Sequence, residues 1–149
     1  MTILALAAGV AGAQKLPATI ELGASLPMPQ LELADATRED DAAKTLASVA
    51  TERGLLVVFT SNTCPFVVGI GPKSEGWEGR YRDLSAFARK LNVGIVFVNS
   101  NEAKRNAGES IEEMRVRAKT YKYQAPYLLD EGHKLADAFG ARTTPHVFL

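Results

Sequence analysis

The sequence predicts a single α/β domain whose sheet contains parallel strands. The chain has 149 residues, which is close to the commonest size of one domain. Two short apolar runs are typical of buried parallel strands, Leu55–Phe59 and Val93–Val98. The segment between them places apolar residues on one helical face, namely Tyr81, Leu84, Phe87, Ala88 and Leu91.

The composition excludes several classes of function. Lys and Arg together number 17, as do Asp and Glu, so the chain has no net charge to favour nucleic acid or an anionic membrane as a partner. A single cysteine provides neither an internal disulfide framework nor a cysteine-based zinc site. The two histidines, His133 and His146, are too few and too far apart for a metal cluster. We expect no metal and no cofactor.

The first 13 residues, MTILALAAGVAGA, have the apolar character and small-residue ending of a secretory signal peptide. They are too few to span a bilayer as a helix. No Lys or Arg precedes Lys15, so either the basic start of the signal lies upstream or the segment is only an apolar tail. With a signal, the protein would work in the periplasm or otherwise outside the cytoplasm, and without one in the cytoplasm.

Residues 14–30 contain Pro17, Pro27 and Pro29, which favour an extended lead-in over a helix. A short edge strand is expected at Leu31–Ala34. The next predicted element is a helix over Ala42–Arg53, with apolar residues at helical spacing and a closing glycine, Gly54.

The only cysteine, Cys64, follows the first buried strand. A polar turn, Thr60–Thr63, lies before it, and Pro65 after it suits the first position of a helix. Cys64 is therefore expected at a strand-to-helix junction, where a helix N-terminus can lower a thiol pKa from about 8.5 to roughly 3.5–7.5. This position favours a reactive thiolate; the alternative is an inert, buried cysteine.

After Cys64, two glycines and a proline at residues 69–72 allow only one or two helical turns before an irregular segment that extends to about Gly76. The second buried strand ends in Asn99 and Asn101, at the carboxyl edge where α/β sheets bind ligands. These amides are expected either to line the site or to form turn hydrogen bonds.

A capping box, Ser110 to Glu113, opens the next predicted helix, with an apolar stripe of Ile111, Met114, Ala118 and Tyr121. Its basic residues are expected on the solvated side without a function: Arg115, Arg117, Lys119 and Lys122. A strand at Pro126–Asp130, a helix at His133–Phe139 closed by Gly140, and an apolar strand beginning at His146 complete the pattern.

Three segments carry a family resemblance. Phe59 precedes Cys64 by five positions, and the run Asn62–Val67 (NTCPFV) resembles the Cys-Pro motif of the peroxiredoxin-like redoxins, relatives of the alkyl hydroperoxide reductase and thiol-specific antioxidant group. Two later segments also resemble this family, Val93 to Asn101 and Pro126 to Leu149. The resemblance therefore covers roughly residues 25–149.

The resemblance implies a thioredoxin-like fold over residues 31–149, with a central mixed β-sheet and helices on both faces. In that fold a further strand and a covering helix would follow Leu149, so we expect the chain to be truncated at its C-terminus. Val67 stands where thioredoxins have their second cysteine, so the Cys-x-x-Cys pair is absent.

The resemblance also implies site residues around a nucleophilic Cys64. Thr144–Pro145 would be a cis peptide facing the sulfur, and Arg142 would be either a cationic neighbour of the thiolate or part of a surface salt bridge. Ser61 would supply the hydroxyl three residues before the cysteine, although the proline expected earlier is absent. Thr63 and Pro65 would be the other residues that support the substrate cleft beside Cys64.

The predicted function is that of a thiol-dependent oxidoreductase of the peroxiredoxin-like type. The Cys64 thiolate would reduce a peroxide or exchange with a disulfide, and an external thiol reductant or partner thiol would restore it. Two alternatives remain: a non-catalytic thioredoxin-fold module that binds peptides, and a thiol-disulfide reductase outside the cytoplasm. The sequence predicts no oligomeric state.

Overall fold

A computed structural model describes residues 18–40 and 42–149 of the chain. The predicted signal segment, residues 1–13, and the start of the lead-in lie outside this part. Within the described part of the chain, no helix has both the length and the apolar character that a membrane span requires.

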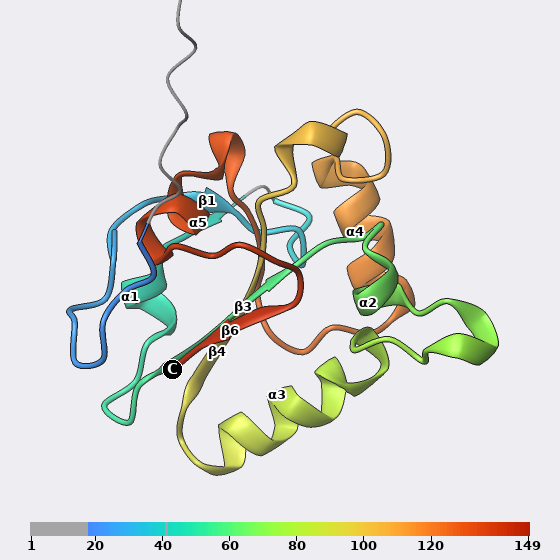
Figure 1. Cartoon of the computed structure of the whole chain (residues 1–149). Helices are drawn as coiled ribbons and strands as arrows, with labels where there is room; N and C mark the ends of the chain where they lie inside the picture. The colour runs from blue at the N-terminus through green and yellow to red at the C-terminus, as the bar shows by residue number, and fades with distance from the viewer. Residues whose placement is uncertain (1–17, 41) are drawn as a thin grey trace, which may run out of the picture.

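A four-stranded sheet forms the centre of the molecule (Figure 1), in the spatial order β5-β4-β3-β6. Its strands are β3 (Leu55–Thr60), β4 (Gly94–Asn99), β5 (Tyr127–Leu129) and β6 (His146–Phe148). The first three run parallel to one another, whereas β6 pairs antiparallel with β3. The predicted mixed sheet is therefore confirmed.

Helices cover both faces of this sheet (Figure 1), as expected. One face carries α2 (Pro65–Val68), α3 (Tyr81–Lys90) and α4 (Ile111–Thr120), and the other carries α1 (Leu46–Val49) and α5 (Lys134–Phe139). Short 3-10 turns connect the elements: η1 (Gly71–Lys73), η2 (Glu78–Arg80), η3 (Glu102–Lys104) and η4 (Glu131–His133).

Alternation along β3 divides its side chains between the two layers, because successive residues of a strand point to opposite faces. Val58 packs into the layer beneath α3 and α4, whereas Val57 and Phe59 pack beneath α1 and α5. Phe59 makes edge-on ring contacts with Phe139 at 5.5 Å and Phe148 at 5.8 Å between centroids. The strand that precedes Cys64 is thus buried on both sides, as its apolar run predicts.

The predicted helix over Ala42–Arg53 is wrong. Residues Ala43–Lys44 form strand β2, which pairs antiparallel with β1 (Leu33–Ala34) in a separate two-stranded sheet. Only one turn, α1, follows, because Thr45 caps its start together with Ser48 and the extended Ala50 ends it. The expected edge strand exists as β1, but it lies outside the main sheet.

The buried face of α3 also differs from the predicted one. Tyr81, Ser85 and Ala88 are buried, whereas Phe87 and Leu91 are exposed by 60% and 43%. Tyr81 determines which side of α3 faces the sheet, because its ring stacks on β4 and its hydroxyl hydrogen-bonds the Thr60 hydroxyl at 2.8 Å. Burial raises the pKa of Tyr81 to about 12.

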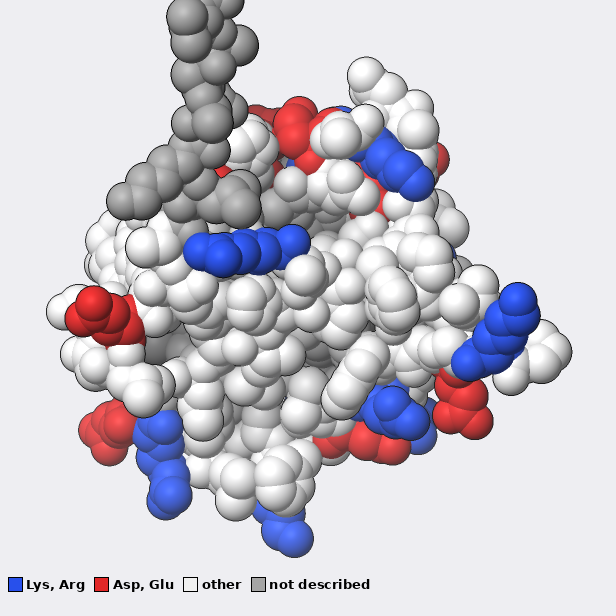
Figure 2. Space-filling model, viewed as in Figure 1, with Lys and Arg blue, Asp and Glu red and all other residues white. Residues whose placement is uncertain are grey.

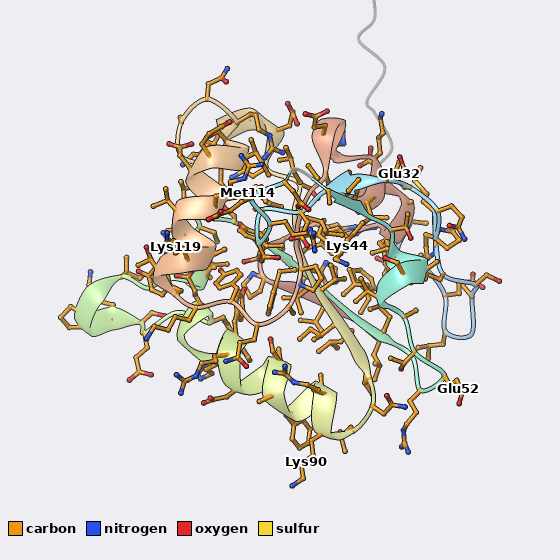
Figure 3. All side chains as sticks on the ribbon, turned by 180° about the vertical axis from the view of Figure 1, so that it is seen from behind. Glu32, Lys44, Glu52, Lys90, Met114 and Lys119 are labelled. Carbon is orange, nitrogen blue, oxygen red and sulfur yellow. The ribbon has the colours of Figure 1, made fainter. Side chains whose placement is uncertain are left out.

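On α4, the predicted stripe is confirmed at Met114 and Ala118, which are buried, but Tyr121 is 47% exposed. Met114 lies on the side of the helix that faces the sheet and Lys119 on the opposite side (Figure 3). The helix begins with the predicted capping box between Ser110 and Glu113.

The chain after Cys64 forms one helical turn, α2, and then a loop that contains η1, as expected. This loop closes back on α2, with the Trp77 N–H donating to the Phe66 carbonyl at 3.1 Å. A Cβ on Gly76 would lie 2.4 Å from both the Gly69 nitrogen and the Val67 oxygen. Only glycine permits this close approach.

Arg117 is not the solvated residue that the sequence predicts. Its Nε and Nη2 donate to the two carboxylate oxygens of Glu78, at 2.7 and 2.5 Å. Glu78 is 4% exposed and also accepts from the Tyr123 hydroxyl at 2.7 Å. This buried pair joins η2, at the start of α3, to the middle of α4.

Arg117→Met should lower the free energy of unfolding by about 2–4 kcal/mol, because it leaves the buried Glu78 carboxylate unpaired. The measurement is urea unfolding followed by circular dichroism. Lys119→Met, on the solvated side of the same helix, is the control and should change stability by less than about 0.5 kcal/mol. Equal losses in the two variants would contradict a structural role for the pair.

Candidate functional site

Cys64 occupies the N-cap position of α2, three residues after the turn that follows β3 begins, and its side chain makes no capping hydrogen bond. Its backbone is extended, with φ −72° and ψ 122°, and Pro65 occupies the first helical position. The predicted strand-to-helix junction is therefore present. Cys64 is a free thiol and is half-buried.

The thiol meets a segment 80 residues away in the sequence. The Cys64 Sγ–H donates to the Thr144 carbonyl at 3.1 Å, and the Thr144–Pro145 peptide bond is cis, as the resemblance implies. Figure 1 shows the loop before β6 next to the start of α2. In Figure 2, charged side chains lie mostly along the margin of the face that carries β6. The sulfur therefore lies against the backbone of the cis Thr144–Pro145 peptide.

A buried carboxylate, Glu109, lies beneath the turn that leads to Cys64. Glu109 has no exposed surface. Its Oε1 accepts from the Ser61 hydroxyl at 2.5 Å and from the Thr63 hydroxyl and N–H at 2.7 and 3.0 Å. Its Oε2 accepts from the Asn62 N–H at 2.8 Å. Each residue between β3 and Cys64 therefore donates to one carboxylate.

Two amides from the end of β4 complete the group that surrounds Glu109. Asn99 Nδ2 donates to Oε2 at 2.6 Å, and Asn101 Nδ2 donates to Oε1 at 3.1 Å. Asn99 also donates to the Tyr127 hydroxyl at 3.1 Å, and that hydroxyl donates to Asn62 Oδ1 at 2.8 Å. The carboxyl ends of β3 and β4 and the Tyr127 side chain from the start of β5 thus share one hydrogen-bond network.

The hydrogen bonds keep Glu109 ionised in spite of its burial. Desolvation by burial acts to raise the pKa of Glu109, but the bonds from Ser61, Thr63, Asn62 and Asn99 outweigh it, and the pKa lies below its ordinary value. Arg105 Nη1 donates to the backbone oxygen of Glu109 at 2.6 Å, which fixes the residue from the other side.

The structure gives the predicted support residues different positions. Ser61 and Thr63 direct their hydroxyls to Glu109. Pro65 is exposed at the start of α2. Arg142 is exposed, and its N–H donates to His146 Nδ1 at 3.2 Å; its place next to the thiolate remains a prediction.

Sequence reasoning missed Glu109 entirely. It stands next to Ser110, whose capping box is a clear local signal, and an acidic residue at a helix start needs no further explanation. Its partner Ser61 is 48 residues away. Asn99, which ends β4, and Asn101 were the signal, because the sheet edge brings them to the site. Both expected roles are present: their amides donate to Glu109, and the Asn101 N–H forms a turn hydrogen bond with Asn99 Oδ1 at 3.1 Å.

Residues 18–40 and 42–149 contain no group of three or more His, Cys, Asp and Glu side chains that could hold a metal ion.

The fold and the lone cysteine opposite a cis-proline define a thioredoxin-like protein. Residues 21–149 match the Redoxin family model, and the chain therefore belongs to the redoxin family. None of the curated proteins matches the chain.

Solved structures share this fold. An uncharacterized conserved protein from Geobacillus kaustophilus is 27% identical, with a TM-score of 0.68 over 82% of this chain and 60% of that one. A hypothetical protein from Sinorhizobium meliloti 1021 is 31% identical, with a TM-score of 0.66 over 84% and 64%. Peroxiredoxin Q from Xanthomonas campestris is 19% identical, with a TM-score of 0.54 over 77% and 63%. The chain thus spans less than two thirds of the length of each of these three proteins.

Glu109→Gln should lower the free energy of unfolding near pH 7 by about 1–3 kcal/mol, because buried donors lose their carboxylate acceptor. Since the pKa of Glu109 is lowered by folding, its carboxylate stabilises the fold above the ordinary carboxyl pKa, and this contribution is lost as the pH falls through the lowered value. The difference between wild type and variant should therefore shrink towards acidic pH, as measured by urea unfolding at several pH values.

Glu112→Gln is the control, because Glu112 is exposed three residues further along. It should leave stability nearly unchanged at each pH. A loss in Glu109→Gln that stays constant from neutral to acidic pH would contradict an ionised Glu109.

Proposed function

We propose that this protein is a thiol-dependent oxidoreductase in which Cys64 is the nucleophile, and that it exchanges with disulfides rather than reducing peroxides. The observation that carries the proposal is the position of the Cys64 sulfur, half-buried and 3.1 Å from the Thr144 carbonyl. A polypeptide disulfide can approach along the backbone at Thr144 and Pro145 and present one sulfur to the thiolate.

The reaction needs an external thiol. The Cys64 thiolate attacks one sulfur of the substrate, an S–S bond forms as the substrate S–S bond breaks, and the other substrate sulfur leaves as a thiolate that takes a proton. Because Cys64 is the only cysteine among the 149 residues, a thiol from the substrate or a partner must attack the mixed disulfide. That second exchange releases Cys64 and forms a new disulfide from the two external sulfurs.

The hydrogen bonds of Ser61 argue against peroxide reduction as the main reaction. Its hydroxyl donates to Glu109 at 2.5 Å and accepts from the Thr63 N–H and from Asn101 Nδ2. To donate to a peroxide oxygen, Ser61 would have to give up a charge-assisted bond to a buried carboxylate, which is among the stronger hydrogen bonds in proteins. With a peroxide, the thiolate would take up one oxygen as a sulfenic acid and release an alkoxide.

The test is to mix the purified protein with a peptide disulfide and to follow the mass of the intact chain. We expect a mixed disulfide on Cys64 that forms at least about tenfold faster than on an unstructured cysteine peptide, as is typical of activated thiols. Cys64→Ser should form none. Parallel samples with hydrogen peroxide and a sulfenic-acid trap should show slower modification.

Two outcomes would contradict the proposal. Fast sulfenic-acid formation with slow disulfide exchange would make the protein a peroxidase. A Cys64 that reacts with neither substrate faster than the unstructured peptide would favour the non-catalytic peptide-binding module.

A further inference from the structure

A pocket of about 470 Å³ opens next to the residue that precedes Cys64. Its walls come from the turn before the cysteine and from the outer side of α4, and they include Asn62, Thr63, Glu112, Glu113, Val116 and Tyr121. Because Thr63 is the chain neighbour of Cys64, with about 3.8 Å between consecutive Cα atoms, a substrate bonded to the sulfur would have its next residues within reach of this pocket.

The walls of the pocket are apolar and its rim is acidic. Val116 is 67% exposed and offers uncovered hydrocarbon surface, and Tyr121 is 47% exposed with the Arg117 guanidinium over its ring at 4.7 Å. Gly108 lets the Thr63 methyl approach closely, since a Cβ at this glycine would lie 2.6 Å from it. A long aliphatic side chain could lie along these surfaces.

Two carboxylates are available at the rim. Glu113 is held in place by hydrogen bonds from the Gly108 N–H at 3.1 Å and from the Ser110 N–H and hydroxyl at 3.0 and 2.9 Å. Glu112 is exposed in the first turn of α4. The one basic residue in the lining, Arg117, is already neutralised by the buried Glu78.

The charge on α4 is divided between its sides. Its other basic residues, Arg115 and Lys119, line a different pocket together with Lys122. The pocket beside Thr63 therefore presents net negative charge, and the chain neighbour of Thr63, Cys64, contacts the Thr144 carbonyl. A polypeptide crossing the sulfur would contact both.

We propose that this pocket binds a lysine or arginine side chain located one or two residues from the reactive cysteine of a polypeptide disulfide. An aliphatic stem with a cationic end matches the apolar wall and the acidic rim. This inference rests on the proposed function, because it names the class of disulfide that Cys64 attacks.

The test compares three peptide disulfides that differ only in the residue next to the cysteine, which is Lys, Gln or Glu. The rate of mixed-disulfide formation on the full chain, followed by intact mass at low ionic strength, should be highest for Lys and lowest for Glu. We expect the Lys peptide to exceed the Glu peptide by about three- to tenfold, the range of one or two exposed ion pairs, and high salt to reduce this ratio.

Glu112→Gln should weaken the preference for the Lys peptide, and Glu112→Lys should abolish it, because the introduced lysine offsets the remaining Glu113 carboxylate. Glu52→Lys is the matched control, because Glu52 is an exposed acid far from α4 (Figure 3), and it should keep the preference of the wild type.

The outcomes separate the two proposals. If all three peptides react equally fast and the Glu112 variants do not change these rates, the pocket does not select a basic residue. The proposed disulfide exchange would still be supported. If none of the peptides reacts with Cys64, the proposed function is wrong and the inference falls with it.

Discussion

The buried carboxylate of Glu109 is the interaction on which the site depends. It accepts from all three residues between β3 and Cys64, and from two asparagines at the end of β4. An unpaired charge at this depth would be strongly destabilising, but six donors compensate it. The same bonds order a turn whose sequence, Ser-Asn-Thr, has no stable conformation of its own. The position of the Cys64 sulfur is therefore a consequence of a hydrogen-bond network beneath it.

Helix α4 links this network to the rest of the molecule. Its first residues follow Glu109 directly and are capped by Ser110 and Glu113. Its middle is joined through Arg117 to the buried Glu78 at the start of α3. Its outer side forms the wall of the pocket next to Thr63. One helix thus contributes to the order of the turn, to the packing of its layer and to the surface that a substrate would meet.

The sequence predicts the parts of this structure that depend on local patterns. The apolar runs identify β3 and β4, and Pro65 identifies the helix start at Cys64, because each is a signal within a few residues. The position of Thr144–Pro145 opposite the sulfur came only from the family resemblance. Glu109 and its donors in the turn before Cys64, and the pair of Glu78 and Arg117, are 39 to 48 residues apart and depend on the folded chain. The predicted helix over Ala42–Arg53 was wrong although it rested on a local pattern. Its apolar periodicity was weak, and the cap at Thr45 starts a helix of only one turn.

The most direct test is to compare two reactions of Cys64 in the wild type and in Glu109→Gln. Alkylation by a small reagent depends on thiol exposure and ionisation, whereas exchange with a peptide disulfide also requires the sulfur to be correctly positioned. The account predicts that the rate of exchange relative to alkylation falls by at least about tenfold in the folded variant. A ratio equal to that of the wild type would show that Glu109 does not position the sulfur.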